Sequence, residues 1–314
     1  MPLRQAVTAA GLITGYVADA VLGDPRRGHP VALFGRAAGA LERRWWADSK
    51  PRGAAYAAAC AGTVTGLGVA AQLATRRRPI ARFALTAAAT WVVLGGRGLA
   101  AEGREMARLL DAGDVPAARA RLSHLCARDA SELDPAELTR AATESIAENT
   151  SDAVVAPLLW GAVAGLPGLL GYRALNTLDA MVGYRSPRHR NFGWAAARAD
   201  DVVNLGPARI GAVLTALSAP LAGGRVGPAL RAWRRYGSHH PSPNAGQVES
   251  AFAGALGVRL GGTNSYGGEV EVRGTLGDGR APQPVDLRRA VRLSRVVGAA
   301  SAVSAAAVAR AVAR

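Results

Sequence analysis

Three carboxylates spaced four residues apart are the strongest chemical signal in this sequence. Glu144, Glu148 and Asp152 have that spacing, and Asn149 lies beside them. Four-residue spacing places side chains on one face of a helix, where like charges repel unless a cation lies against them. Mg²⁺ or an arginine is the natural partner for such oxygens. A solvated acidic face is the alternative, but the apolar run from Ala153 favours a position near a membrane surface.

A second group combines carboxylates and carboxamides with arginines on the far side of that apolar run. Acidic oxygens at helical spacing can hold Mg²⁺, while guanidinium groups bind the phosphoryl oxygens of a substrate. An ion-paired helical hairpin explains the same spacing, so both interpretations stay open. The group comprises Asn176, Asp179, Arg185, Arg188, His189, Arg190, Asp200, Asp201, Asn204 and Arg209.

Two loop regions carry further candidate residues. The turn-forming sequences GDP and HP hold Asp24 and His29 just outside the first apolar segment, although a lone histidine is more often structural than catalytic. Later, Ser242, Asn244 and Asn264 lie in SHHPSPNAGQ and LGVRLGGTNSYGG. Glycines in such stretches allow nests of backbone N–H groups that bind anions, but each stretch alone is a weak signal.

The elements that must position these residues are mostly apolar helices. The run 53–75 has no charge and is long enough to cross a hydrocarbon core of ~30 Å, whereas 83–96 crosses only if a snorkelling Arg82 is included. The run 153–172 contains two prolines and several glycines, which predicts a kinked or re-entrant helix. Buried helices of a soluble bundle are the alternative for each run. Weaker candidates are 3–23, 202–224 and 290–309.

The polar regions predict helices and little else. Asp134, Pro135 and Glu137 form a helix start with a capping box, and only 269–276 alternates like a strand of a short hairpin. We therefore expect an all-α polytopic integral membrane protein with about four to six membrane helices, of which one could be re-entrant. Extramembrane helical regions and a Gly-rich loop region complete one membrane domain over 1–314.

The charge balance is strongly basic but does not choose a partner by itself. Lys and Arg outnumber Asp and Glu by 38 to 23, which gives +15 and suits nucleic acid, anionic lipid or a polyanionic substrate. Nucleic acid is disfavoured because the basic residues flank apolar runs and only 5% of residues are aromatic. Cys60 and Cys126 form neither a disulfide framework nor a cysteine metal site.

Five ordered blocks of the chain resemble the CobD/CbiB family, the adenosylcobinamide-phosphate synthases of cobalamin biosynthesis. The sequence departs from the family pattern at Leu205-Gly206, where bulkier residues are expected, and at Ala153, where glycine is expected. These departures concern packing more than chemistry. The matching blocks are 19–35, 144–160, 172–185, 197–210 and 242–268.

The resemblance implies a multi-pass enzyme of the cell membrane, with a corrinoid as substrate. Such an enzyme joins adenosylcobyric acid to (R)-1-amino-2-propanol or its O-phosphate by an amide bond. Carboxylates do not condense with amines unaided in water, so we expect an ATP-dependent ligase that uses Mg²⁺ and whose site faces the cytoplasm, where ATP is. The sequence leaves an oligomer or a partner protein of the cobalamin pathway open.

Residue roles follow from the chemistry rather than from the resemblance. We expect Glu144, Glu148, Asp152, Asp200 and Asp201 to position metal. Arg185 and Arg209 would bind phosphate, and Asp24 or His29 would take a proton from the attacking ammonium. Asn149 is grouped with the catalytic residues, and the remaining substrate-binding candidates are Asn176, Asp179, Asn204, Ser242, Asn244 and Asn264.

Two other classes of protein are alternatives. A membrane regulator or scaffold like the AmpE relatives of this family would keep the fold and lose the carboxylate motifs, which are present here. A Mg²⁺-dependent intramembrane prenyltransferase would use paired Asp-rich helices on an isoprenoid diphosphate, which NTLD and the Asp200-Asp201 pair imitate. Comparing the binding of an isoprenoid diphosphate with that of adenosylcobyric acid separates the prenyltransferase from the ligase.

Overall fold

The computed structural model describes residues 2–25, 28–184, 186–266 and 269–312, with the backbone alone at 2–4, 263–266 and 269–272. The chain folds into helices and one hairpin, which form two compact units. Unit 1 is drawn from Met1–Gly95, Ala156–Asn204 and Ser301–Arg314, and unit 2 from Gly96–Val155 and Leu205–Ala300. Each unit is therefore assembled from separate stretches of the chain.

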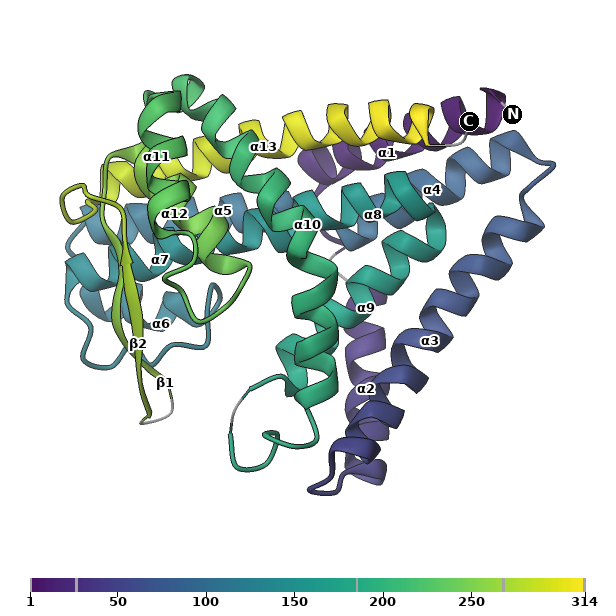
Figure 1. Ribbon diagram of the computed structural model, residues 1–314, viewed down its shortest axis with the longest axis horizontal. Helices are drawn as coiled ribbons and strands as arrows, with labels where there is room; N and C mark the ends of the chain where they lie inside the picture. Colours follow the sequence, from purple (N-terminus) through teal and green to yellow (C-terminus); the bar gives the residue numbers. More distant parts are fainter. Residues whose placement is uncertain (1, 26–27, 185, 267–268, 313–314) are drawn as a thin grey trace. The chain divides into compact units, whose positions relative to one another are not determined.

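Unit 1 consists of helices, two pairs of which pack along one another. Helix α1 packs along α4, and α3 packs along α9 (Figure 1). Its helices are α1 (Pro2–Leu22), α2 (Pro30–Trp45), α3 (Lys50–Ala74), α4 (Pro79–Val93), α8 (Ala156–Ala164) and α9 (Leu166–Val182), with the first part of α10 (Trp194–Ser218) and the end of α13 (Pro284–Ala311).

Small residues bring α1 and α4 into close contact. A Cβ atom on Gly15 would lie 2.4 Å from Cβ of Thr90, and one on Gly11 would lie 2.7 Å from Cβ of Thr86. Two glycines four residues apart form a flat stripe on one helix face, as in many membrane helix pairs. The tight α1–α4 pair therefore depends on the absence of side chains on α1.

The run 153–172 does not form one straight helix, as its prolines and glycines predicted. Helix α8 ends at Ala164, Gly165 has a φ of 69°, and α9 then begins with Pro167 in its first turn. The side-chain oxygen of Gln72 accepts the Leu166 N–H at 3.1 Å, which satisfies one of the open donors of the new helix. The expected kink is confirmed.

Unit 2 combines helices with an antiparallel hairpin that packs against α7 and α12. The strand predicted near 269–276 is confirmed as β2, whereas its partner β1 forms in a segment that we had predicted as a Gly-rich loop. Its elements are α5 (Gly96–Asp111), α6 (Val115–Leu122), α7 (Pro135–Thr150), a π-helical turn (Ser151–Val155), a 3₁₀ turn (Ala219–Ala222), α11 (Val226–Tyr236), α12 (Ala245–Leu256), β1 (Leu260–Tyr266) and β2 (Glu269–Leu276), with parts of α10 and α13.

The start of α7 is the predicted capping box. Asp134 accepts the Glu137 N–H at 2.8 Å through its carboxylate, and Glu137 accepts the Asp134 N–H at 3.0 Å. Pro135 at the first helical position needs no donor partner. This start fixes where the following acidic residues lie along the helix.

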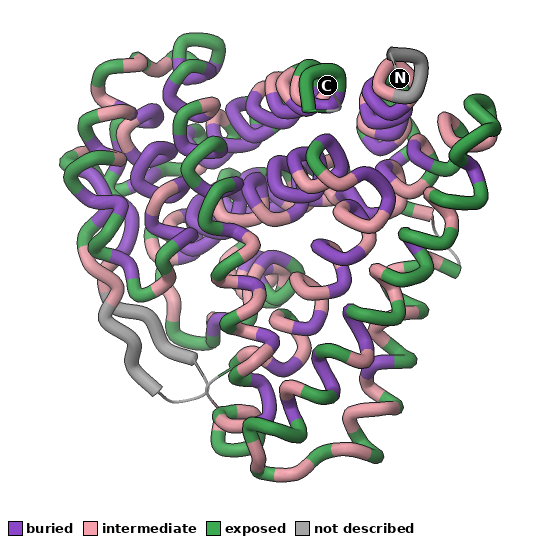
Figure 2. The backbone as a smooth tube through the Cα atoms, turned by 45° about the vertical axis from the view of Figure 1, so that its right-hand side comes forward, coloured by how far each residue is buried: buried purple, intermediate pink, exposed green. Residues whose placement is uncertain are grey.

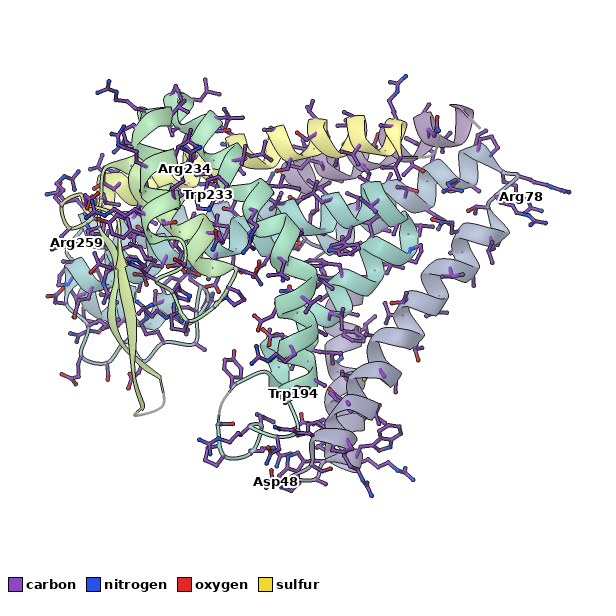
Figure 3. All side chains as sticks on the ribbon, in the orientation of Figure 1. Asp48, Arg78, Trp194, Trp233, Arg234 and Arg259 are labelled. Atoms are coloured by element: carbon purple, nitrogen blue, oxygen red, sulfur yellow. The ribbon has the colours of Figure 1, made fainter. Side chains whose placement is uncertain are left out.

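Five helical segments are long and apolar enough to cross a membrane among the described residues: Gln5–Leu22, Lys50–Ala74, Pro79–Asp111, Trp194–Ala222 and Pro284–Ala311. Large apolar side chains on them face outward, as Leu67 and Ile80 do, and exposed residues continue along most of α3 (Figure 2). Arg78 extends away from the helices at the turn between α3 and α4 (Figure 3). The expected all-α polytopic membrane protein is confirmed.

Candidate functional site

A buried ion pair forms the centre of the acidic group in unit 2. Glu144 of α7 accepts a hydrogen bond from Nη2 of Arg128 at 2.6 Å, and both side chains are only 2% exposed. The other carboxylate oxygen accepts the Gly261 N–H at 2.8 Å and lies 3.4 Å from Nη1 of Arg140. Mg²⁺ or an arginine was the partner expected for this carboxylate, and in the structure two arginines lie against it.

The start of β1 is built to reach Glu144. Gly261 has a φ of 79°, and a Cβ there would lie 2.0 Å from the carbonyl oxygen of Gly274 on the opposite strand. Only glycine fits this backbone without strain. Arg140 also donates to the Gly261 carbonyl. The backbone N–H and C=O of this glycine are therefore both bound by side chains of α7.

Glu249 of α12 is an acidic residue that the sequence analysis missed. It is fully buried, and neither of its carboxylate oxygens has a hydrogen-bond partner among the described residues. Loss of solvation raises its pKa well above the ordinary value, and the negative charges of Glu144 and Glu148 raise the pKa further. The positive charges of Arg273 and Arg128 lower the pKa, but by less. Figure 1 shows α12 with α7 and the hairpin. A usable signal existed, because Glu249 is the only charged residue in the apolar α12 sequence AGQVESAFAGAL.

The other residues of the predicted stripe differ in position. Glu148 is half-buried in the last turns of α7, and Asn149 donates to the carbonyl oxygen of Ser145 at 2.9 Å. Asp152 lies in the π-helical turn, where i→i+5 bonding replaces i→i+4. The segment that carries Asp152 therefore departs from the i→i+4 hydrogen bonding on which the four-residue stripe was predicted.

Residues 238–244, rich in Ser, His and Pro, lead into the first turn of α12. The Ser242 hydroxyl accepts the Asn244 and Ala245 N–H groups, both at 3.2 Å, and His240 accepts the Ser242 N–H at 2.9 Å. Ser242 therefore helps to position the helix that carries Glu249. Asn264 lies in β1 opposite Glu271, and its side chain is outside the described residues.

The donor set of unit 2 suits Mg²⁺ bound together with a phosphate substrate. In the described part of the chain no three His, Cys, Asp or Glu side chains form a ready-made metal cage. Mg²⁺ is usually bound by one or two carboxylates plus waters and substrate phosphates, so such a cage is not required. The unpartnered oxygens of Glu249 beside Glu148 provide hard donors of this kind. The other predicted metal residues, Asp200 and Asp201, belong to unit 1.

The second predicted group is brought together in unit 1 by α9 and α10. Asn204 donates to Asp200 at 2.9 Å and accepts a hydrogen bond from the Tyr172 hydroxyl at 2.9 Å. Asp179 and Asp201 add negative charge near Asp200, and Asn176 lies within hydrogen-bonding reach of it. Asp201 also pairs with Arg198 at 3.6 Å. The predicted carboxylates and carboxamides of this group therefore do converge.

The structure describes only one of the two predicted phosphate-binding arginines. Arg209 is exposed on α10, and its Nη1 donates to the Leu205 carbonyl of its own helix at 2.8 Å. Arg185 lies outside the described residues. Arg173 of α9, which was not predicted, instead donates to Asn176 at 3.3 Å.

Asp24 and His29 line a pocket of about 410 Å³ in unit 1. Nδ1 of His29 accepts the Val31 N–H at 3.2 Å and so caps α2, while Nε2 lies 3.6 Å from Asp24. The neutral imidazole thus carries its proton on Nε2 and its lone pair is used by the cap. Asp24 is therefore better placed than His29 to accept a proton.

The comparison with protein families decides the assignment, because residues 12–294 match the model of the CobD/Cbib protein family. The chain belongs to this family. The match includes both carboxylate groups and the pocket. No solved structure matches the chain.

Relatives from several organisms are similar over most of the chain. A protein of Mycobacterium tuberculosis named "Cobalamin biosynthesis protein CobD" is 56% identical over 94% of both chains. A protein with the same name from Geobacter metallireducens is 42% identical over 88% of this chain and 89% of its own length. Another from Rhodobacter capsulatus is 41% identical over 91% of this chain and 93% of its own length.

Proposed function

We propose that this protein acts in cobalamin biosynthesis as an ATP-dependent ligase of the cell membrane. It joins the free carboxylate of adenosylcobyric acid to (R)-1-amino-2-propanol or its O-phosphate. Similarity to relatives named for cobalamin biosynthesis supports the pathway. The observation that carries the reaction type is the buried cluster of unit 2, where the carboxylates Glu144 and Glu249 lie with Arg128.

The proposed reaction has two balanced steps. First, an oxygen of the corrinoid carboxylate attacks the γ-phosphorus of ATP and ADP leaves, which gives an acyl phosphate. The amine nitrogen then attacks the acyl carbon, the C–O bond to phosphate breaks, and inorganic phosphate leaves. The ammonium must lose a proton before attack, so a base is needed near the amine.

The residues of unit 2 supply what the first step requires. Arg140 and Arg128 give positive charge beside the buried carboxylates and can stabilise charge on transferred phosphoryl oxygens. Glu148 would hold Mg²⁺, with Asp152 as a further candidate, and Glu249 would join them on releasing its proton as the metal binds. When bound, the ion would offset phosphate charge and orient ATP.

The residues of unit 1 fit roles in the second step. Asp24 would take the proton of the amine, since the His29 lone pair is used by a helix cap. Asp200, Asp201, Asp179, Asn176 and Asn204 would bind substrate or a second metal-phosphate group, and Arg185 and Arg209 remain candidates for phosphate. The active site would face the cytoplasm because ATP is available there.

Product analysis with purified protein tests this function. Protein in detergent receives adenosylcobyric acid, ATP, Mg²⁺ and either aminopropanol or its phosphate, and mass spectrometry measures the amide product. Omitting ATP should abolish the product and yield no ADP. Amide formed equally well without ATP, or binding of isoprenoid diphosphate in place of the corrinoid, would contradict the proposal.

Trapping with hydroxylamine tests the order of the steps. Without amine, an acyl phosphate should accumulate, and hydroxylamine should convert it to a hydroxamate. Arg209→Lys should lower the yield of hydroxamate if Arg209 binds phosphate, because an ammonium cannot form the bidentate hydrogen bonds of a guanidinium. Phosphate released only after amine is added, with no hydroxamate, would favour another activated group.

A further inference from the structure

The pocket of unit 1 lies where four helices meet. Its walls come from the turn after α1, the start of α2, the end of α4 and the middle of α9. Leu94 and Met181 give it an apolar side, while Asp24, Arg173 and Thr177 give it charge and hydrogen-bonding groups. Apolar walls with a few convergent polar groups are typical of small-molecule sites.

The polar groups of the pocket are held in place before any ligand binds. Nε1 of Trp91 donates to the Gly23 carbonyl at 2.8 Å, which fixes the turn that presents Asp24. Arg173 donates to Asn176 one turn along α9. The Thr177 hydroxyl donates to the Arg173 carbonyl at 2.7 Å, so its free lone pairs can only accept.

The charges of the pocket match a small molecule that has both an ammonium and an anionic group. Asp24 is 47% exposed and can take an ammonium, and the Arg173 guanidinium can take a phosphate by paired hydrogen bonds. At about 410 Å³ the pocket is near the lower end of the ~300–1,000 Å³ typical of small-molecule sites. A corrinoid, with its ring of long side chains, is too large to be enclosed there.

We propose that this pocket binds the amine substrate of the ligation, and this inference rests on the proposed function. Asp24 binds the ammonium and accepts its proton, and Arg173 binds the phosphate of the phosphorylated amino alcohol. Leu94 and Met181 contact the methyl group of the three-carbon chain. Arg173 and Asp24 therefore determine which amine is used.

Calorimetric binding to the purified full-length protein in detergent tests the pocket with three probes. Aminopropanol phosphate carries both charges, 1-amino-2-propanol lacks the phosphate, and isopropyl phosphate lacks the amine. Loss of one charge-assisted contact should weaken binding by ~10- to 100-fold. Arg173→Gln should do so for both phosphates and leave aminopropanol unaffected. Asp24→Asn should weaken both amines and leave isopropyl phosphate unaffected.

A control variant separates the pocket from general charge effects. Arg77→Gln removes an exposed arginine of the same unit that does not line the pocket, and it should bind all three probes like the wild type. Melting temperatures show whether each variant is folded. For any variant that is not, Arg173→Lys and Asp24→Glu replace the neutral changes and should retain partial affinity.

The outcomes distinguish this inference from the proposed ligase function. Probe selectivity as described, without amide product under any condition, would keep the pocket and contradict the ligase. If Arg173→Gln and Asp24→Asn are folded, form the amide, and bind the amine with the affinity and KM of the wild type, the ligase function stands and the assignment of the pocket is overturned. Equal weakening of all three probes by each variant would also overturn it, because each residue would then act only through the fold.

Discussion

Burial determines the charge state of Glu249 in α12. Its pKa lies well above the ~4.3 of an exposed glutamate, chiefly because desolvation disfavours the carboxylate. Between these two pKa values the folded protein keeps the proton and the unfolded chain releases it. The contribution of Glu249 to stability is therefore complete below about pH 4.3 and is lost as the pH rises toward the folded-state value.

Glu249→Gln should flatten the pH dependence of stability. The amide has the shape of the protonated acid but does not titrate, so the unfolded state gains nothing from ionisation. As the pH rises above about 4.3, Tm in detergent should fall less in the variant, and the slope removed is at most ~1.4 kcal/mol per pH unit. Parallel Tm curves for the two proteins would show that Glu249 is ionised in the folded state.

The Arg128–Glu144 pair should be intolerant of losing one partner. Glu144→Gln leaves a buried guanidinium without its counter-charge, which costs ~3–5 kcal/mol. The double variant Arg128→Met/Glu144→Gln should recover part of that loss. Urea unfolding in detergent measures both, with Glu105→Gln in the exposed Arg108–Glu105 pair as the control that changes little. Equal losses in control and test variants would mean that the buried pair is not specially stabilising.

Glu148→Gln tests the metal role apart from folding. The change keeps size and hydrogen-bonding capacity but removes one charge, so turnover should fall strongly while Tm is nearly unchanged. Manganese binding followed by electron paramagnetic resonance should weaken as well. Glu132→Gln, at an exposed position before α7, is the matched control. Normal turnover over a full Mg²⁺ titration would identify Glu148 as part of a solvated face.

Individual residues differ in how far sequence could predict them. Spacing identified Glu144 and Glu148 because four-residue periodicity is a local property of a helix. The partners of Glu144 could not be predicted, since Gly261 reaches it only through the long-range packing of the hairpin on α7. Glu249 had a local signal as the only charged residue of α12, but its position beside Glu144 and Glu148 depends on long-range packing. The Asp24 and Arg173 pocket needs three separate stretches of chain.

Helix pairing in unit 1 should be sensitive to one methyl group. Gly15→Ala places a Cβ 2.4 Å from Thr90 and 2.5 Å from the Ala87 carbonyl, so α1 and α4 must separate. Overpacking of this kind costs ~1–3 kcal/mol. Gly66→Ala on α3 has nothing within 4 Å of the new Cβ and should leave Tm unchanged or slightly higher. Equal Tm values for Gly15→Ala and the wild type would show that the α1–α4 contact is loose.

Elements with local signals were predicted and those that depend on partners were not. The capping box at Asp134 and the break at Gly165 are properties of a few adjacent residues, and both were found. The π-helical turn at Ser151–Val155, which contains Asp152, has no local signature in the sequence. Strand β1 is rich in glycine and forms through pairing with β2.

The whole molecule should behave as an integral membrane protein. Helix α3 has no charged residue after Arg52 and exposes Leu67 and Leu73, so water is a poor solvent for it. After an alkaline carbonate wash the protein should remain in the membrane pellet, and only detergent should release it. Recovery as a monomer in the wash supernatant would contradict the assignment of the five helices as membrane spans.

The division of unit 2 between two stretches of chain also sets an order of events during synthesis. Arg128 and Glu144 leave the ribosome close together, but Gly261 follows Glu144 by 117 residues. At ~5–20 residues per second, α7 waits about 6 to 23 s for the strand that covers its acidic face. Throughout that interval Glu144 lacks its Gly261 partner, and a product truncated before β1 would keep this face of α7 uncovered.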